Sequence, residues 1–361
     1  MQKTHIISER IYGLDLLRVL LSICVVTIHI LHYGGFRSHA DSSTLGFYFL
    51  WLWGIIIDCT VNCFAIITGF LLYIRGFKYT NIIRLYLIVL YHGLLITLAF
   101  QQFYPEFVTK SHWLQAMFPI SQNEFWYFTA YSGVFFFAPI LTSGMRSLSK
   151  KQATALVFSL VIIFSILPTL TNRDPFGLDR GYSVLWILVM FLIGTYLGKY
   201  YDTFRLKSST LVSIFLGCIL FTCLGMIASV LNPSVNGNVL IEYTSPTIVL
   251  AAISVVLLFS SMKVSHRVQR IAVFCLPFTF STYLIHEHPL IRQYLIYDRF
   301  VSVLSLPAVV QVISVLIISL IIWGFCFFLD YVRYSLFRFF KIDDMLLRME
   351  RQLAVMNKNA S

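Results

Sequence analysis

Three ionisable side chains stand in the first apolar stretch of the sequence, at a spacing that places them on one side of a helix. The stretch GLDLLRVLLSICVVTIH covers residues 13–29 and contains Asp15, Arg18 and His29. An α-helix turns by about 100° per residue, so Arg18 and His29 face the same direction about three turns apart, and Asp15 precedes Arg18 by one turn. At about 1.5 Å per residue, Arg18 and His29 are roughly 16 Å apart. Such a stripe must face protein or water, because an ionisable group in hydrocarbon is costly.

These residue types favour proton transfer at the imidazole and anion binding at the guanidinium. An imidazole titrates near neutrality, so His29 suits a general base that takes the proton of a hydroxyl nucleophile. Arg18 suits recognition of phosphate. Other interpretations stay open. Asp15 and Arg18 could form an ion pair that orients the helix, Arg18 could extend to the membrane surface, and His29 could be a neutral histidine bonded to a neighbouring helix.

A second polar cluster occurs late in the sequence, at His286, Glu287 and His288. Imidazole and carboxylate groups ligate zinc, but adjacent residues on a helix project in different directions, and no further ligand has a recognisable spacing, so we expect no metal. His286 and Glu287 are candidates for the entrance of an acceptor site, which would bind the molecule that carries the hydroxyl nucleophile. The alternative is an interfacial cluster that caps the end of a helix.

Three further residues are candidates for contact with an acceptor. The rings of Trp126 and Tyr127 suit stacking on a sugar, although both residue types also belong to the aromatic belt at a membrane surface. Asn62 lies one turn after Asp58 inside an apolar run. These two residues either form a hydrogen-bonded pair or line a reaction cavity.

The composition requires a lipid bilayer around these residues. Of 361 residues, 58% are hydrophobic and 12% are charged, whereas roughly a quarter are charged in a typical soluble domain. Apolar runs long enough to span a bilayer recur about ten times. We therefore predict an all-α integral membrane protein whose spans cover residues 13–33, 46–74, 82–103, 124–143, 153–171, 182–199, 209–231, 245–262, 271–296 and 304–330.

The basic residues predict the orientation of these spans. Most of the 27 lysines and arginines fall in the two terminal segments and in every second connection. Connections rich in Lys and Arg stay in the cytoplasm, so both termini are predicted to be cytoplasmic. Because topology accounts for the net charge of +11, no nucleic-acid partner is expected. Residues 1–330 are predicted to form one membrane domain, and residues 331–361 a basic amphipathic cytoplasmic tail.

Four motifs together resemble the membrane acyltransferase-3 family of multi-spanning bacterial O-acyltransferases. The first is GLDLLR followed by His29, with ten residues between the arginine and the histidine. The others are CFAIITGFLLY at 63–73, FWYFTAYSGVFFFAPIL at 125–141 and FSTYLIHEHPLIR at 280–292. Thr68 stands where the family has a serine. The order and spacing of the motifs cover nearly the whole chain.

The resemblance implies a multi-pass enzyme of the bacterial cytoplasmic membrane that transfers an acyl group, usually acetyl, from cytoplasmic acetyl-CoA. The acceptor would be a hydroxyl of a cell-surface polysaccharide or of its lipid-linked precursor. His29 would be the catalytic base and Arg18 its essential companion. The family also has an Arg-x-x-Arg pair at the start of the third span, where only Arg84 matches. Lys78 or Arg75 would supply the second positive charge for binding coenzyme A.

Two other classes of membrane protein share the broad features of the sequence. A lipid-linked sugar flippase or transporter also has many spans and buried charges, although no paired repeat or broken-helix signature is visible. A polysaccharide polymerase is also polytopic, but the connections here are short. Both stay as alternatives to the acyltransferase at this level.

Overall fold

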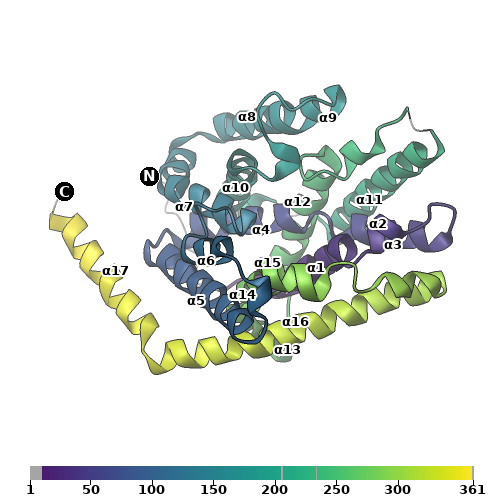
Figure 1. Cartoon of the computed structure of the whole chain (residues 1–361). Helices are drawn as coiled ribbons and strands as arrows, with labels where there is room; N and C mark the ends of the chain where they lie inside the picture. Colours follow the sequence, from purple (N-terminus) through teal and green to yellow (C-terminus); the bar gives the residue numbers. More distant parts are fainter. Residues whose placement is uncertain (1–9, 205, 233, 360–361) are drawn as a thin grey trace.

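The protein is built of helices. The computed structural model describes residues 10–204, 206–232 and 234–359, and no strand occurs among them (Figure 1). Within these residues, 8 helices are long and apolar enough to cross a membrane, and two shorter apolar helices accompany them. Each predicted stretch corresponds to one of these elements, so the predicted all-α membrane fold is confirmed.

The helices follow the chain with short connections. The apolar ones are α1 (Tyr12–Tyr33), α3 (Leu45–Ile57) continued by α4 (Thr60–Arg75), α5 (Thr80–Phe103), α7 (Trp126–Ser147), α8 (Lys150–Val161) continued to α9 (Leu167–Thr171), α10 (Val184–Lys199), α11 (Ser208–Leu231), α12 (Pro246–Ser261), α13 (His266–Cys275) continued to α14 (Thr279–Glu287), and α16 (Ala308–Phe339). The remaining α-helices are α2 (Phe36–His39), α6 (Lys110–Met117), α15 (Pro289–Ile291) and α17 (Ile342–Asn359).

Two helix ends differ from the prediction. The sequence predicts one stretch to residue 296, but α14 ends at Glu287, and His288 has a ψ of 131°. Pro289 explains this, because a proline disfavours the helical conformation of the residue before it. The second difference is at the end of α16, which continues to Phe339 and not to residue 330 as predicted. The predicted boundary between residues 1–330 and 331–361 therefore falls inside a helix. The division into two domains stays a prediction. Residues 1–9 and 360–361, which belong to these two predicted domains, lie outside the described part.

Several basic helix ends meet at one end of the bundle, which we call the basic end. The Arg146 guanidinium donates to the carbonyl of Tyr73, and the Lys199 ammonium donates to the carbonyl of Met145. These bonds join the ends of α4, α7 and α10. α1 also begins here, because Gly13 lies against the backbone of Phe259 at the end of α12. The cytoplasmic orientation of this end stays a prediction.

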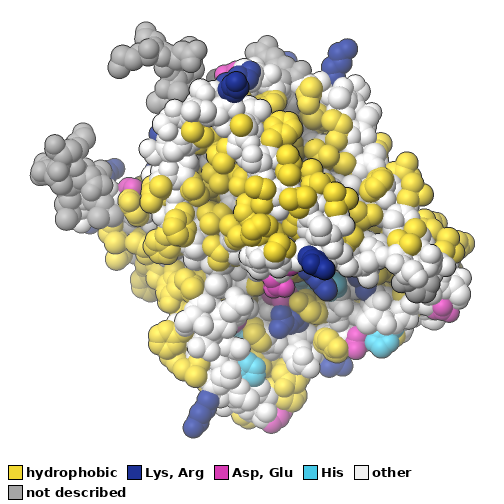
Figure 2. Space-filling view, turned by 90° about the horizontal axis from the view of Figure 1, so that it is seen from above, with side chains coloured by type: hydrophobic (Ala, Val, Ile, Leu, Met, Phe, Trp, Pro, Cys, Tyr) yellow, Lys and Arg dark blue, Asp and Glu magenta, His cyan; other side chains and the backbone are white. Residues whose placement is uncertain are grey.

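The outer surface of the bundle is apolar. Figure 2 shows a broad area of hydrophobic side chains on the face on which α8 and α9 lie, with charged side chains and histidines toward one side of it. Phe158 and Leu170 are 66% and 77% exposed on these helices. A soluble protein rarely exposes so much contiguous apolar area, whereas lipid would cover it. α1 lies inside, in contact with α4, α12, α13, α14 and α16.

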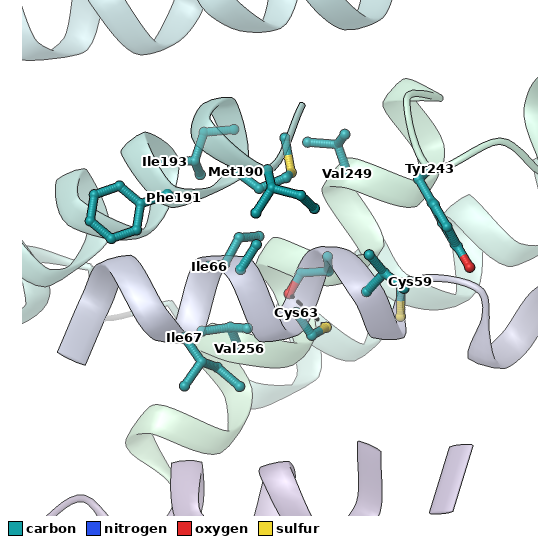
Figure 3. Packing of buried hydrophobic residues seen from close by; sticks show 14 of the residues in the cluster. Cys59, Cys63, Ile66, Ile67, Met190, Phe191, Ile193, Tyr243, Val249 and Val256 are labelled. Atoms are coloured by element: carbon teal, nitrogen blue, oxygen red, sulfur yellow. Dashed lines mark hydrogen bonds between the residues drawn. The ribbon is translucent and has the colours of Figure 1, made fainter. Parts of the chain in front are cut away.

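The largest core forms where α4 packs against α10 and α12 (Figure 3). Glycines allow the backbones of α4 and α10 to touch. A Cβ atom on Gly69 would lie 2.0 Å from the carbonyl oxygen of Phe191, and one on Gly194 would lie 2.1 Å from that of Ile66. Small residues at helix interfaces permit this close approach in membranes. The contact holds α4 in place, with Val61, Phe64 and Thr68 facing the cavity described below.

We expect Gly194→Leu to destabilise the protein by about 1–3 kcal/mol or more, because the new side chain must push α10 away from α4. Thermal unfolding of the purified protein in detergent, followed by intrinsic fluorescence, measures the loss. Gly217→Leu on α11 is the matched control, since nothing lies within 4 Å of a Cβ atom built there. Equal unfolding temperatures for the two variants would contradict this account of the packing.

Candidate active site

Arg18 and His29 line one cavity, as their spacing on α1 predicts. This inner cavity has a volume of about 200 Å³. Arg18 lies toward the basic end and His29 in the last turns of α1, near the opposite end. Trp126 and Tyr127, at the start of α7, also line it. The predicted polar stripe therefore faces a space inside the protein.

The Arg18 guanidinium has no hydrogen-bond or ion-pair partner within the part of the chain that the structure describes. Asp15, the predicted partner, is buried and bonds instead to Arg10, the residue that precedes α1. Asp15 thus bonds to the residue before the helix, and its orienting role stays a prediction. An arginine inside a membrane bundle without a partner is costly, so its place in the cavity points to an anionic ligand.

His29 belongs to a buried cluster with two residues of α14, His286 and Glu287, which we call the His29 cluster. The Nδ1 atom of His29 lies 2.8 Å from Nε2 of His286 and 3.1 Å from Oε2 of Glu287. The sequence did not predict that these candidates, more than 250 positions apart, bond to each other. Neither His286 nor Glu287 is among the residues that line the inner cavity.

Hydrogen-bond partners determine the tautomer of His29. The Nδ1 atom of His286 faces the carbonyl oxygen of Thr282, which only accepts, so this nitrogen carries the proton. Its Nε2 atom is then an acceptor, and the proton between the two rings must reside on Nδ1 of His29. A neutral imidazole has only one N–H. The Nε2 atom of His29 therefore bears a free lone pair, which is the form that a general base requires.

Glu287 is held from its other side by a cation. The Nη1 atom of Arg292 lies 2.5 Å from Oε1 of Glu287, and the Tyr33 hydroxyl lies 3.5 Å from the same oxygen. The carboxylate is thus fixed between Arg292 and the imidazole. His29, His286 and Glu287 are also close enough to share a metal ion, with ligand atoms within 4.8 Å of one another. The hydrogen bond between the two imidazoles and the ion pair of His29 with Glu287 account for this geometry, and the predicted lack of a metal stays a prediction.

Two tyrosine hydroxyls provide unused donors beside the cavity. Tyr127 and Tyr283 both line it, and their buried hydroxyl groups have no hydrogen-bond partner among the described residues. The ring centroid of Tyr283 lies 6.1 Å from that of His29. The sequence predicts only an aromatic surface at Tyr127 and does not single out Tyr283, although Tyr283 lies within the FSTYLIHEHPLIR motif.

Asn62 lies away from the cavity. Its amide donates to the carbonyl of Tyr243 over 2.8 Å and accepts from the indole of Trp186 over 2.9 Å. Both groups of the amide are thus used in packing. Asp58, which the sequence places one turn before Asn62, instead has its Oδ2 atom 3.7 Å from Nη2 of Arg37.

The predicted donor-binding residues Arg75, Lys78 and Arg84 are exposed around the end of α4 and the start of α5. None of them is among the residues lining the inner cavity. Arg84 bonds over 2.7 Å to Asp343 of α17. Glu350 of the same helix accepts from Thr80. α17 leaves α16 at an angle in Figure 1 and therefore lies beside the start of α5, where Arg84 is located.

Sequence reasoning missed two buried polar networks. His92 of α5 lies 2.7 Å from Asp330 of α16, and Arg333 donates to both oxygens of the same carboxylate. Glu124 lies 3.7 Å from His288. Neither oxygen of Glu124 has a hydrogen-bond partner among the described residues, and burial raises the pKa of this carboxyl from 4.5 to about 7. His92 and Asp330 could have been found in the sequence, because each is an ionisable residue inside an apolar run.

We expect Glu124 to make the protein less stable as the pH rises from about 5 to about 7. The folded state then binds a proton that the unfolded state has already released, so stability falls over this window. Glu124→Gln, which resembles the protonated form, should remove this fall and give a higher unfolding temperature than the unmodified protein at pH 8. Exposed Glu106 supplies the control, Glu106→Gln. Parallel pH profiles for the protein and Glu124→Gln would disprove the assignment.

The chain matches a known protein family. A family model described as an acyltransferase domain matches residues 11–329. No curated protein and no solved structure matches the chain at a significant level.

Proposed function

Because the chain belongs to this acyltransferase family over nearly its whole length, we propose that it transfers an acyl group, acetyl by preference, from acyl-CoA to a hydroxyl of a cell-surface glycan or its lipid-linked precursor. Family membership indicates an acyltransferase, and the apolar helices indicate a multi-pass membrane protein. The proposal places it in the bacterial cytoplasmic membrane. The observation that carries it is one cavity lined by a free arginine and by an imidazole with a free lone pair.

In the proposed reaction, Nε2 of His29 takes the proton of the acceptor hydroxyl as its oxygen attacks the thioester carbonyl. The C–O bond forms, the C–S bond breaks, and the imidazolium returns the proton to the thiolate of coenzyme A. Glu287 stabilises the imidazolium through Nδ1, so its role is to position the base and not to contact the acceptor. The unpartnered hydroxyls of Tyr127 and Tyr283 are suitable donors for the carbonyl oxygen while it carries negative charge.

Arg18 has a different role from His29 because of the distance along α1. The two residues are roughly 16 Å apart by helical rise, which is too far for both to contact one carbonyl group. Arg18 therefore binds a remote, anionic part of the donor. Coenzyme A carries phosphates, and guanidinium groups bind phosphate with paired hydrogen bonds. Arg75, Lys78 and Arg84 at the basic end would bind the phosphates that lie outside the cavity.

Family membership favours acyl transfer over both alternatives that the sequence leaves open. A flippase or a polymerase has no use for a thioester donor, and neither is the activity that the family match indicates. The donor would enter from the basic end and the acceptor from the end where α1 finishes.

We expect His29→Ala to lower the rate of acyl transfer by about 10²–10⁴-fold, because the hydroxyl loses its base. Incubating the purified protein with radiolabelled acetyl-CoA and glycans measures this rate, and equilibrium dialysis measures binding of coenzyme A, which should persist. His39→Ala is the matched control, since His39 is 48% exposed and pairs with Asp298. Undiminished turnover in His29→Ala would reject the proposed base.

We expect Glu287→Gln to lower kcat by about 10²–10⁴-fold while the KM for acyl-CoA stays within about twofold, because only the positively charged imidazole needs the carboxylate. Glu287→Asp should restore part of kcat, since it keeps the charge. A merely structural role predicts instead that both variants lose folded protein in parallel, which size-exclusion chromatography detects. A large rise in KM with normal kcat would assign Glu287 to binding.

A further inference from the structure

A larger cavity adjoins the inner cavity on the side away from the basic end. This vestibule has a volume of about 630 Å³. Ile28, His32, Tyr182 and Tyr243 line both spaces, so the two are neighbours along one passage. The loops before α10 and before α12 form much of its wall. His29 is not among the residues that line the vestibule.

Three buried polar groups in the vestibule wall have no hydrogen-bond partner among the residues that the structure describes. The atoms concerned are Nε and Nη2 of Arg37, Nε1 of Trp51 and Oδ2 of Asp58. The side chains of Arg37 and Asp58 are 12% and 7% exposed, and they form an ion pair whose charged atoms are 3.7 Å apart, beyond hydrogen-bond distance. An unpaired buried polar group costs about 1–3 kcal/mol, and more when it is charged. Such a set indicates a ligand that both donates and accepts hydrogen bonds.

Gly54 of α3 leaves space for the side chain of Arg37. A Cβ atom on Gly54 would lie 2.1 Å from Nη2 of Arg37, so only glycine leaves room for the guanidinium beside α3. The guanidinium also lies over the Trp51 ring, 4.7 Å from its centroid. Arg37, Trp51 and Asp58 are therefore held together as one unit, which we call the Arg37 group.

Aromatic rings connect the Arg37 group to the inner cavity. The rings of Trp126 and Tyr182 are 4.5 Å apart between centroids, and those of Tyr182 and Tyr243 are 5.2 Å apart. Flat rings of this kind pack against the C–H face of a sugar, which gains dispersion contacts. The passage from the vestibule to His29 is thus lined by surfaces suited to a sugar.

The charges of the vestibule favour a hydroxyl-rich ligand over a polyanion. Three arginines and four acidic residues line it, so positive charge is not in excess. A phosphate-rich ligand such as coenzyme A would meet carboxylates there. Sugar hydroxyls, by contrast, donate to Asp58 and accept from Arg37 and Trp51.

We propose that the vestibule is a second sugar subsite, in which the Arg37 group binds the sugar next to the one that is acylated. This rests on the proposed function for the identity of the reaction at His29. The acceptor is then a glycan of at least two joined sugars. A glycosyl transfer that joins these sugars must therefore precede acylation.

The test compares acceptors of one and two sugars with the full-length protein in lipid nanodiscs. A panel of methyl glycosides and the corresponding disaccharides is assayed with saturating labelled acetyl-CoA. We expect a KM at least about tenfold lower for the best disaccharide than for its methyl glycoside, the effect of one charged hydrogen bond. Asp58→Asn and Trp51→Phe should each raise the KM for the disaccharide about tenfold and leave the KM for acetyl-CoA unchanged.

Matched controls are Asp202→Asn and Trp113→Phe, since neither residue lines the vestibule. Gly54→Ala is an independent variant, which displaces Arg37 without removing a polar group, and it should also raise the KM for the disaccharide. Equal KM values for one and two sugars, or unaltered KM values in all three variants, would overturn the subsite.

Binding without a donor separates this proposal from the proposed function. Saturation-transfer NMR with the disaccharide alone measures contact between sugar and protein. Binding that depends on Asp58, in the absence of any acyl transfer, would support the subsite and reject the proposed function. Acyl transfer with no dependence on Asp58 or on the second sugar would support the function and reject the subsite.

Discussion

The cost of placing an ionisable group at membrane depth determines the position of α1. Arg18 and His29 lie on one side of a mostly apolar helix, and lipid cannot solvate them. α1 is therefore surrounded by α4, α12, α13, α14 and α16, while helices such as α8 and α11 present apolar side chains outward. The polar stripe and the cavity are two consequences of one constraint, because the groups that cannot face lipid must line a protected space.

The same constraint explains why the polar residues of α14 meet α1. An imidazole in the interior needs a partner for its N–H, and His286 and Glu287 supply acceptors for Nδ1 of His29. Glu287 in turn needs a cation, which Arg292 provides from the segment after Pro289. The helix break before Pro289 lets the chain turn so that Arg292 returns to the carboxylate. Arg292 thus compensates the charge of Glu287, which lies beside the imidazole of His29, and Nε2 of His29 keeps a free lone pair.

The spans and the shared face of Arg18 and His29 could be predicted because they depend on local periodicity and hydropathy. The end of α14 could also have been read from Pro289. Partners that come from distant helices could not be predicted. Asp15 bonds to Arg10 and not to Arg18, and Asn62 bonds to Trp186 and Tyr243, because helix packing decides which polar groups meet. His286 and Glu287 were identified as polar candidates, but only the fold joins them to His29.

The sizes of the two cavities bear on how the proposed reaction avoids water. The base, two tyrosines and the arginine line the inner cavity of about 200 Å³, and the vestibule of about 630 Å³ lies beyond it. A thioester that reached His29 through the inner cavity alone would meet whichever hydroxyl stood there, including water. A glycan held by the Arg37 group would fill the passage that Tyr182 and Tyr243 line and exclude water from it. Recognition of the second sugar would then protect the thioester from hydrolysis as well as select the acceptor.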